Sequence, residues 1–245
     1  MNEIIDSLYK RKSVRVFTDK DISKEDRDLI LRSAIEAPTA GNQVLYTIID
    51  AQDQSVKDRL SVLCDNQPFI AKAKMVLVFV ADCKRWYDTY ALAGAPNREP
   101  SMGDMMLACS DALIAAQNTV VAAESLGIGS CYIGDIMEQK NDISELLGLK
   151  PFLFPITMLV FGYPTESQIK RVKPKRVDLD DVVMVDKYED RSDDRLKKMI
   201  SDLGSANTDF DDYVIKFAKR KYMSEFCREL NKSVEGYFDE LKRID

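Results

Sequence analysis

Hydrophobic and polar residues follow one another along the chain with two spacings, one helical and one extended. Apolar residues recur every third or fourth position in segments that we predict as helices: 4–8, 24–37, 56–63, 101–126, 193–203 and 213–241. Runs rich in β-branched and aromatic residues predict strands at 44–51, 75–81, within 127–135 and at 155–162. The runs at 75–81 and 155–162 are apolar almost throughout, so we expect both faces of these strands to be buried.

The segment 101–126 and the segment after residue 190 have opposite patterns. Small and apolar residues cover most of the circumference of the first, which is typical of a central helix or of a helix at a subunit interface. The second is charged, helical in spacing and too polar to form a core of its own. We therefore predict two parts, residues 1–190 and a helical extension, residues 191–245, that packs on another surface.

Composition and charge narrow the class of protein. A chain of 245 residues with 45% hydrophobic residues can bury a large core. Its formal net charge of −6 argues against a nucleic-acid-binding protein. We find no apolar run near membrane-spanning length, and Glu3 and Asp6 do not fit the charge pattern of a signal peptide. We expect a cytoplasmic protein with neither a membrane nor a nucleic acid as partner.

The chain contains five cysteines and no histidine, which restricts its chemistry. The cysteines are widely spaced and form no Cys-x-x-Cys motif, so we predict neither a disulfide framework nor a metal site. The absence of histidine excludes the Ser-His-Asp and Cys-His nucleophile systems. If the chain is an enzyme, we expect a cofactor to carry the chemistry, with no catalytic side chain.

A basic segment follows the first predicted helix. In extended chain, Arg11, Ser13 and Arg15 share one face, and Val14 and Val16 share the other. Two guanidinium groups and a hydroxyl on one face suit a phosphate monoester, because guanidinium offers permanently charged, bidentate donors. A solvated basic edge strand has the same pattern, and these residues alone leave both interpretations open.

Two other segments also have two interpretations. Residues 37–43 form a small polar loop whose backbone and amide groups could approach a flat ligand, although loops of this composition are usually plain helix-to-strand turns. Residues 170–176 are basic, which fits a polyanion-binding patch or a solvated loop.

In order and spacing these segments resemble the FMN-dependent nitroreductase superfamily, in particular the oxygen-insensitive nitroreductases and flavin reductases with a C-terminal helical extension. The resemblance covers residues 4–188 closely and the tail more loosely. The motifs that carry it are RKSVRVF at 11–17, APTAGNQ at 37–43, NQPF at 66–69, the glycine-rich segment 127–134 and KPKR at 173–176. Each motif is weak alone, and their common order makes the combination specific.

The resemblance implies an FMN site. It implies phosphate and ribityl contacts from Arg11, Lys12, Ser13 and Arg15, with Arg15 also near the flavin N1 edge. Its other implied contacts are a loop from the second subunit (Thr39, Ala40, Gly41, Asn42 and Gln43), a hydrogen bond to the pyrimidine ring (Gln67), backbone passing the reactive ring (Tyr132, Ile133 and Gly134), and further phosphate contacts (Lys173 and Lys175).

The chain departs from the family pattern at two positions. Asp135 stands where the family usually has a second glycine. It either caps a helix, in a capping box with Glu138, or faces the flavin, and we favour the cap. Lys175 stands where the family usually has arginine, so either Lys175 or Arg176 contacts the phosphate.

The resemblance also implies a fold and an activity. The fold is α+β, with a mainly antiparallel central sheet flanked by helices in an interlocked homodimer whose extension, residues 191–245, packs on the partner. The activity is transfer of two electrons from NAD(P)H to nitroaromatics or quinones with ping-pong kinetics. The alternatives are a dedicated free-flavin reductase and, from another class, a non-enzymatic polyanion-binding protein. For an NADPH 2′-phosphate, the candidates by charge are Lys216, Lys219 and Arg220, although we favour a solvated helix face as the interpretation of these residues.

Overall fold

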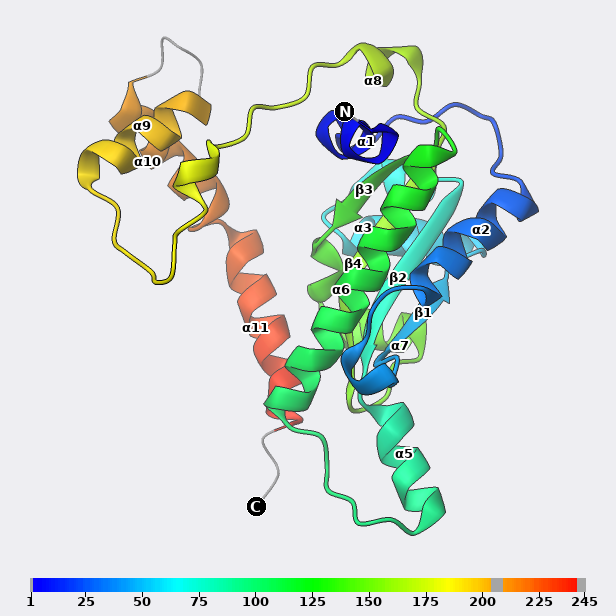
Figure 1. Ribbon diagram of the computed structural model, residues 1–245. Coiled ribbons are helices and arrows are strands. Elements are labelled where there is room, and N and C mark those ends of the chain that lie inside the picture. The colour runs from blue at the N-terminus through cyan, green and yellow to red at the C-terminus, as the bar shows by residue number, and fades with distance from the viewer. Residues whose placement is uncertain (1, 204–208, 242–245) are drawn as a thin grey trace. The chain divides into compact units, whose positions relative to one another are not determined.

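The computed structural model describes residues 2–203 and 209–241, which form two compact units (Figure 1). The first contains Met1–Arg171 and Glu229–Asp245, and the second contains Val172–Arg228. The second unit thus begins at Val172, and the end of the last helix returns to the first unit. The expected division into residues 1–190 and 191–245 stays a prediction. Residues 1, 204–208 and 242–245 of the two expected parts lie outside the described residues. Packing of the extension on a dimer partner stays a prediction.

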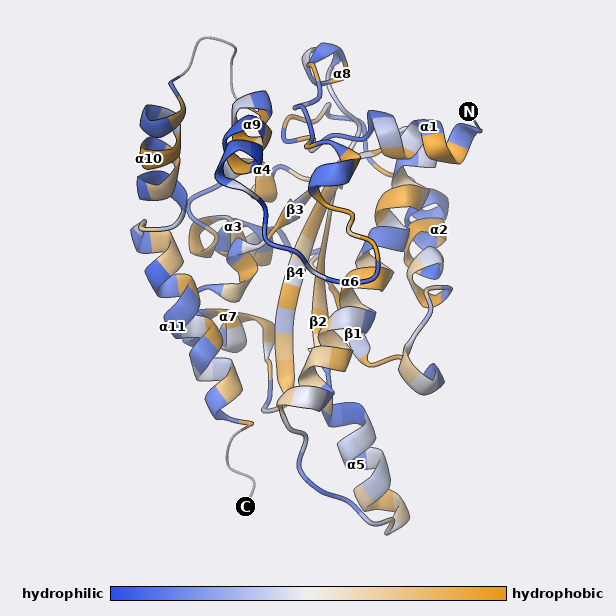
Figure 2. Ribbon diagram, turned by 60° about the vertical axis from the view of Figure 1, so that its left-hand side comes forward, coloured by the Kyte–Doolittle hydropathy of each residue, from blue (hydrophilic) through white to orange (hydrophobic). Residues whose placement is uncertain are grey.

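The first unit is built on a four-stranded sheet with the order β1-β2-β4-β3. All three strand pairs are antiparallel, which confirms the expected sheet. Its strands are β1 (Tyr46–Asp50), β2 (Met75–Asp82), β3 (Gly129–Ile133) and β4 (Leu153–Gly162). Every residue of β2 is buried, as its apolar run predicts, and Figure 2 shows hydrophobic residues along β2 and β4.

The helices confirm most of the predicted segments, and the sequence pattern missed α4, α5, α7 and α8. Those of the first unit are α1 (Glu3–Lys10), α2 (Lys24–Ile35), α3 (Gln54–Leu63), α4 (Pro68–Ala71), α5 (Lys84–Ala93), α6 (Met102–Ser125), α7 (Lys140–Leu147) and α8 (Glu166–Lys170). The second unit contains α9 (Asp193–Leu203), α10 (Phe210–Lys221) and the start of α11 (Glu225–Asp239). Ser23 caps α2 as predicted, with its Oγ accepting from Asp26 N at 3.0 Å.

Helices cover both faces of the sheet. α2 and α6 pack on one face, where fully buried alanines such as Ala112 and Ala116 bring α6 close to β2 and β4. On the other face, α3, α4 and α7 bury Leu60, Ile70 and Ile143 against the strands. A third cluster at one end of the sheet includes Tyr237 of α11, whose ring lies 5.0 Å from that of Phe154.

The expectation that no apolar run approaches membrane-spanning length was wrong for α6. This helix has 24 residues and is long and apolar enough to cross a membrane by length and composition alone. Its apolar character has a local cause, since its small residues form the core of the first unit between α2 and the sheet.

The basic segment 11–17 runs in extended form past the end of β3, as predicted. Val14 N donates to Ser130 O at 2.9 Å, and Phe17 forms an isolated bridge with Pro164. The approach is close because two cross-strand glycines lie beneath it: a Cβ on Gly129 would stand 2.5 Å from Val14 Cγ2, and one on Gly162 would stand 2.6 Å from Phe17 Cδ1. Because glycine has no side chain, these two positions allow the basic segment to pack closely against β3 and β4.

We expect Gly129→Ala to lower the free energy of unfolding by about 1–3 kcal/mol, because the added methyl group overlaps Val14 and forces backbone apart. Gly103→Ala is the matched control, since a Cβ there meets no atom within 4 Å. Urea unfolding of both variants measures the difference, and equal stabilities would show that the segment shifts without cost.

Candidate functional site

Three polar side chains of the basic segment converge on β3. Burial raises the pKa of the Cys131 thiol, and Arg15, Ser13 and Arg11 oppose that rise, so all three lie around this one sulfur. The side chains of Arg11, Ser13 and Arg15 therefore lie on one face of the segment, as the alternation predicts. Of the two valines predicted for the other face, Val14 is buried and Val16 is 50% exposed.

Aromatic rings flank both guanidinium groups. Arg11 Cζ lies 5.7 Å from the centroid of Tyr132, and Arg15 Cζ lies 5.9 Å from the centroid of Phe69. Burial raises the pKa of Tyr132 to about 12 against the lowering effect of Arg11, so the phenol stays neutral. Each ring offers a cation–π contact and a flat apolar surface beside a positive charge.

Arg11 has donors that the described residues leave unsatisfied. Its Nε and Nη2 atoms are buried without a hydrogen-bond partner within 2–203 and 209–241, and so is Ser130 Oγ on the neighbouring strand. A buried guanidinium without acceptors is costly, and an anion bound there would supply the missing acceptors. The donor set thus fits the phosphate group that the resemblance implies.

Lys12 points away from these groups. Its Nζ donates to Ile169 O at 2.7 Å and to Arg171 O, which fastens the segment to the end of α8. The Arg171 guanidinium in turn donates to Ser13 O. Lys173 and Lys175 belong to the second unit, and their phosphate contacts stay a prediction.

Gln67 lies in a loop that closes on itself. The side-chain Nε2 of Gln67 donates to Cys64 O at 2.8 Å, and the backbone carbonyl oxygen of Gln67 accepts from Ser61 Oγ at 2.8 Å. Burial, then Asp135 and Glu138, raise the pKa of Cys64, so the turn after β3 neighbours this loop. The structure therefore brings the Gln67 loop and the segment of Tyr132, Ile133 and Gly134 to the same end of the sheet.

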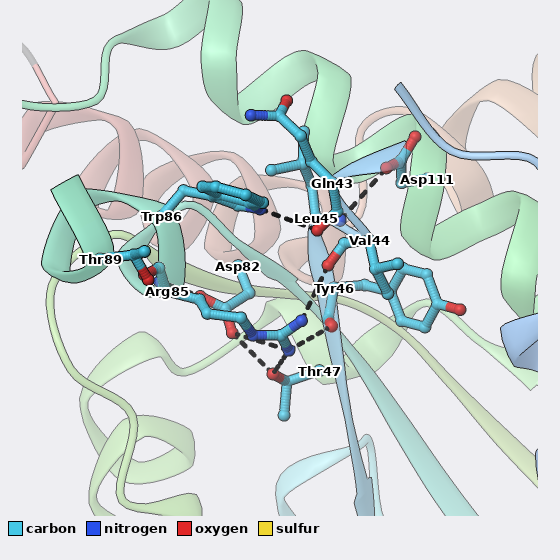
Figure 3. A network of polar contacts seen from close by, with 10 residues as sticks. All are labelled: Gln43, Val44, Leu45, Tyr46, Thr47, Asp82, Arg85, Trp86, Thr89 and Asp111. Carbon is cyan, nitrogen blue, oxygen red and sulfur yellow. Dashed lines mark hydrogen bonds and ion pairs between the residues drawn. The ribbon is translucent and has the colours of Figure 1, made fainter. Parts of the chain in front are cut away.

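The loop 39–43 is held by one buried carboxylate on α6. Asp111, 3% exposed, accepts from the Thr39 hydroxyl and from Ala40 N at 3.0 Å. It also accepts from Leu45 N at 3.2 Å, the contact that Figure 3 shows. Gly41 and Asn42 have φ values of 58° and 56°, which permit the tight turn. The sequence analysis missed Asp111, although a lone acid among small apolar residues of a predicted helix is a usable signal.

Arg85 of α5 fixes the end of this loop where β1 begins. Its guanidinium donates to Val44 O at 3.0 Å, to Tyr46 O at 2.8 Å and to Thr47 Oγ1 at 2.9 Å (Figure 3). Asp82 completes the group by accepting from Thr47 Oγ1 at 2.6 Å. Sequence reasoning missed this group because α5 was not predicted.

The loop and the basic segment lie far apart within one chain. Arg11 and Lys12 act on the pKa of Glu124, which places them near that end of α6, whereas Asp111 holds the loop 13 residues earlier (124 − 111). At the rise of an α-helix this separation is about 20 Å.

Comparison with known proteins identifies the family. The Nitroreductase family profile matches residues 8–163, more than half of the chain. The chain belongs to the Nitroreductase family. The resemblance inferred from the motifs is thereby confirmed.

Two relatives of this nitroreductase-family chain come from Bacillus subtilis (strain 168). FMN reductase (NADPH) is 31% identical over 94% of this chain and 98% of its own length, and FMN reductase (NAD(P)H) is 34% identical over 70% of each. Among solved structures, B. megaterium NfrA2 has a TM-score of 0.83 at 30% identity and covers 97% of this chain and 98% of its own.

The capping box expected at Asp135 is not formed, because the turn after β3 in this nitroreductase-family chain is too short. Asp135 is the first residue of a three-residue 3-10 turn, Asp135–Met137, whose N-cap is Gly134. Glu138 already lies beyond the turn in extended conformation, so its side chain does not occupy the third helical position that a capping box requires.

Glu138 is instead a buried acid. It is 6% exposed, and its Oε1 has no hydrogen-bond partner among the described residues. Burial, followed by the charges of Asp135, Asp65 and Glu229, raises its pKa to about 7.

The described residues contain no cluster of three or more His, Cys, Asp or Glu side chains that could hold a metal ion.

Glu138 should make stability fall as pH rises. Its pKa is raised from 4.5 to about 7, so the folded chain binds this proton more tightly, and the stabilisation present below pH 4.5 is lost as pH rises through 7. Chemical unfolding measures the free energy of unfolding at pH 5 and at pH 8. This free energy should fall less between the two pH values in Glu138→Gln than in the parent, and the difference between the two proteins should be at most about 3 kcal/mol. Glu99→Gln, at an exposed site, is the control, and parallel pH curves for all three proteins would contradict the assignment.

Proposed function

We propose that this chain is an FMN-dependent NAD(P)H oxidoreductase, a nitroreductase, that binds FMN through its basic segment. The observation that carries the proposal is the pair of buried, unsatisfied donors Nε and Nη2 of Arg11, beside Tyr132, in a chain of the Nitroreductase family. Relatives named FMN reductase (NADPH) and FMN reductase (NAD(P)H) support both the cofactor and the electron donor.

The proposed site would hold the charged end of FMN at one side and its uncharged ring at the other. Arg11, Ser13 and Arg15 would bind the FMN phosphate and ribityl chain, and backbone next to Lys12 would follow it. Gln67 would turn its amide towards the pyrimidine ring, which requires it to release Cys64 O. Backbone of Tyr132, Ile133 and Gly134 would pass the reactive ring, and Asp135 would lie at its edge.

Bound FMN supplies the chemistry of moving two electrons between a nicotinamide and an acceptor. The chain's own residues bind and orient it, since no histidine is present and no nucleophile is required. The aromatic ring beside Arg11, whose Nε and Nη2 atoms are buried, would limit the access of water to the charged contact and so strengthen it. The proposed acceptors are nitroaromatics and quinones.

A homodimer follows from the separation within one chain. The loop 39–43 and the basic segment lie about 20 Å apart along α6, whereas the family pattern has both at one flavin. A second copy related by a two-fold axis would bring its loop to the first copy's arginines, giving two shared sites. Exposed apolar residues on α6, such as Met106, Leu113 and Ile114, offer a surface for that contact.

A free-flavin reductase is the second candidate, because both B. subtilis relatives carry that name. Steady-state rates with a nitroaromatic, a quinone and free FMN as acceptors separate the two activities.

We also propose that the protein is located in the cytoplasm.

Truncation of the arginines tests the cofactor assignment. Arg11→Ala and Arg15→Ala should each weaken FMN binding by about 1.5–3 kcal/mol, as expected for hydrogen bonds to a charged group. The absorption spectrum of the purified protein measures the flavin content, and Arg32→Ala, at an exposed position on α2, is the control. A variant lacking both arginines that retained full flavin would overturn the site.

Mixed dimers test the shared site. One subunit carries Arg11→Ala with Arg15→Ala, and its partner carries Asp111→Ala, which releases the loop. If each site takes arginines from one subunit and the loop from the other, one site of the mixed dimer keeps both and about half of the activity returns. If the arginines and the loop of each site come from the same subunit, neither site of the mixed dimer is complete. The mixed dimer then stays as inactive as the homodimer of either variant.

A further inference from the structure

Glu138 is a buried acid that the proposed FMN contacts do not use. Its side chain is almost fully enclosed, and its Oε1 has no hydrogen-bond partner within residues 2–203 and 209–241. Burying a carboxylate without partners is costly, whereas the protonated carboxyl group needs far less solvation. The protonation state of Glu138 therefore depends strongly on the charges around it.

The charged groups around Glu138 come from three other places in the chain and are all acidic. Asp135 lies in the turn after β3, Asp65 in the loop after α3 and Glu229 on α11. After the larger effect of burial, each of these three carboxylates raises the pKa of Glu138. The neighbouring Cys64 thiol adds no charge, because burial raises its pKa and keeps it neutral.

Lys140, two residues along the chain from Glu138, pairs with another acid. Its Nζ forms a salt bridge with Glu240. Its backbone N donates to Ser233 Oγ at 2.9 Å, and Ser233 Oγ donates to Met137 O at 2.7 Å. These contacts hold α11, with its acid, against the turn after β3.

The acidic group lies next to two segments that are expected at the flavin ring. Gln67, the expected partner of the pyrimidine ring, donates to Cys64 O at 2.8 Å, and Glu138 acts on the thiol of the same cysteine. Glu138 N donates to Asp135 O at 3.0 Å, in the turn that begins at Gly134. A change of charge at the ring would therefore act on Glu138.

We propose that Glu138 takes up a proton from water when the bound FMN receives two electrons, and that it holds this proton until the acceptor removes them. The inference rests on the proposed oxidoreductase function and adds a proton-holding residue to it. Two electrons bring negative charge to the ring, and a negative charge nearby favours the neutral form of a carboxyl group. Burial and the acidic neighbours already raise the pKa of Glu138 to about 7, so the added charge acts near neutral pH.

The proton balance of the reaction requires such an uptake. NAD(P)H gives up a hydride, which carries two electrons and one proton, and becomes NAD(P)⁺. A quinone that becomes a hydroquinone gains two electrons and two protons, so the second proton comes from water. Glu138 holds that proton between the two half-reactions and returns it through solvent to the oxygen of the acceptor as the electrons leave. It acts through its charge and does not need to touch the ring.

The pH dependence of the FMN midpoint potential measures this uptake. The potential is determined between pH 6 and pH 9 in the flavin-loaded parent and in Glu138→Gln, where a neutral amide of similar size replaces the acid. The slope of the potential against pH gives the number of protons taken up per two electrons. If the added charge strengthens proton binding at Glu138 tenfold, the parent should take up about 0.5 proton more than Glu138→Gln at pH 7.5. Glu99→Gln, at an exposed site, is the control and should match the parent.

Asp65→Asn is a second test, because it removes one repelling charge and keeps the carboxyl group of Glu138. Asp65 is exposed, and its φ of 59° is a conformation that asparagine tolerates. The additional proton uptake should persist in this variant and be centred at a lower pH than in the parent. A purely structural role of the acidic group would not produce that displacement.

Equal proton uptake in the parent and in Glu138→Gln, or an unchanged pH centre in Asp65→Asn, would overturn the inference. If Glu138→Gln does not bind flavin, the comparison of Asp65→Asn with the parent decides alone. Flavin content and anaerobic bleaching of the flavin by NADPH are measured on the same samples. Their absence in the parent would reject the proposed function, whereas full flavin and bleaching with equal proton uptake would reject only the role of Glu138.

Discussion

The close packing of α6 on the sheet is the constraint on which both parts of the candidate site depend. Alanines at the contact bring the helix backbone near β2 and β4, and this fixes the positions of two polar residues on the same helix. Asp111 holds the loop 39–45, and Glu124 faces the start of the basic segment. Because a helix is rigid over this length, the fold sets the distance between the two parts, and this distance supports the proposed shared site between subunits.

The sequence was sufficient to predict those features that depend on short segments with a regular pattern of residues. Alternation predicted that Arg11, Ser13 and Arg15 meet, and apolar runs predicted β2 and β4. It failed where a long-range contact decides. Lys12 belongs to the same motif, yet its Nζ binds carbonyls more than 150 residues away in sequence, a competition that local patterns do not encode.

Turn length and unpredicted elements explain the other differences. Asp135 and Glu138 have the spacing of a capping box, but the chain makes a single 3-10 turn there, and the acid at its end becomes buried. Arg85 and Trp86, whose Nε1 donates to Gln43 O, could not be assigned because their helix, α5, was not predicted from the sequence. Of the three anchors of the loop 39–45, only Asp111 had a signal in sequence, as an acid inside an apolar helix.

Opposite charges at the two ends of the candidate site lead to a conclusion about its ligand. Arg11 and Arg15 provide positive charge at one end, and Asp65, Asp135 and Glu138 gather near the turn after β3 at the other. An anionic ligand centred at the second end would be repelled by the charges of Asp65 and Asp135, which, after burial, also raise the pKa of Glu138. A ligand with one anionic end and one uncharged, flat end satisfies both regions. Because binding at the first end removes the cost of unsatisfied donors on Arg11, such a ligand should stabilise the folded chain, and its charged end should contribute most of that gain.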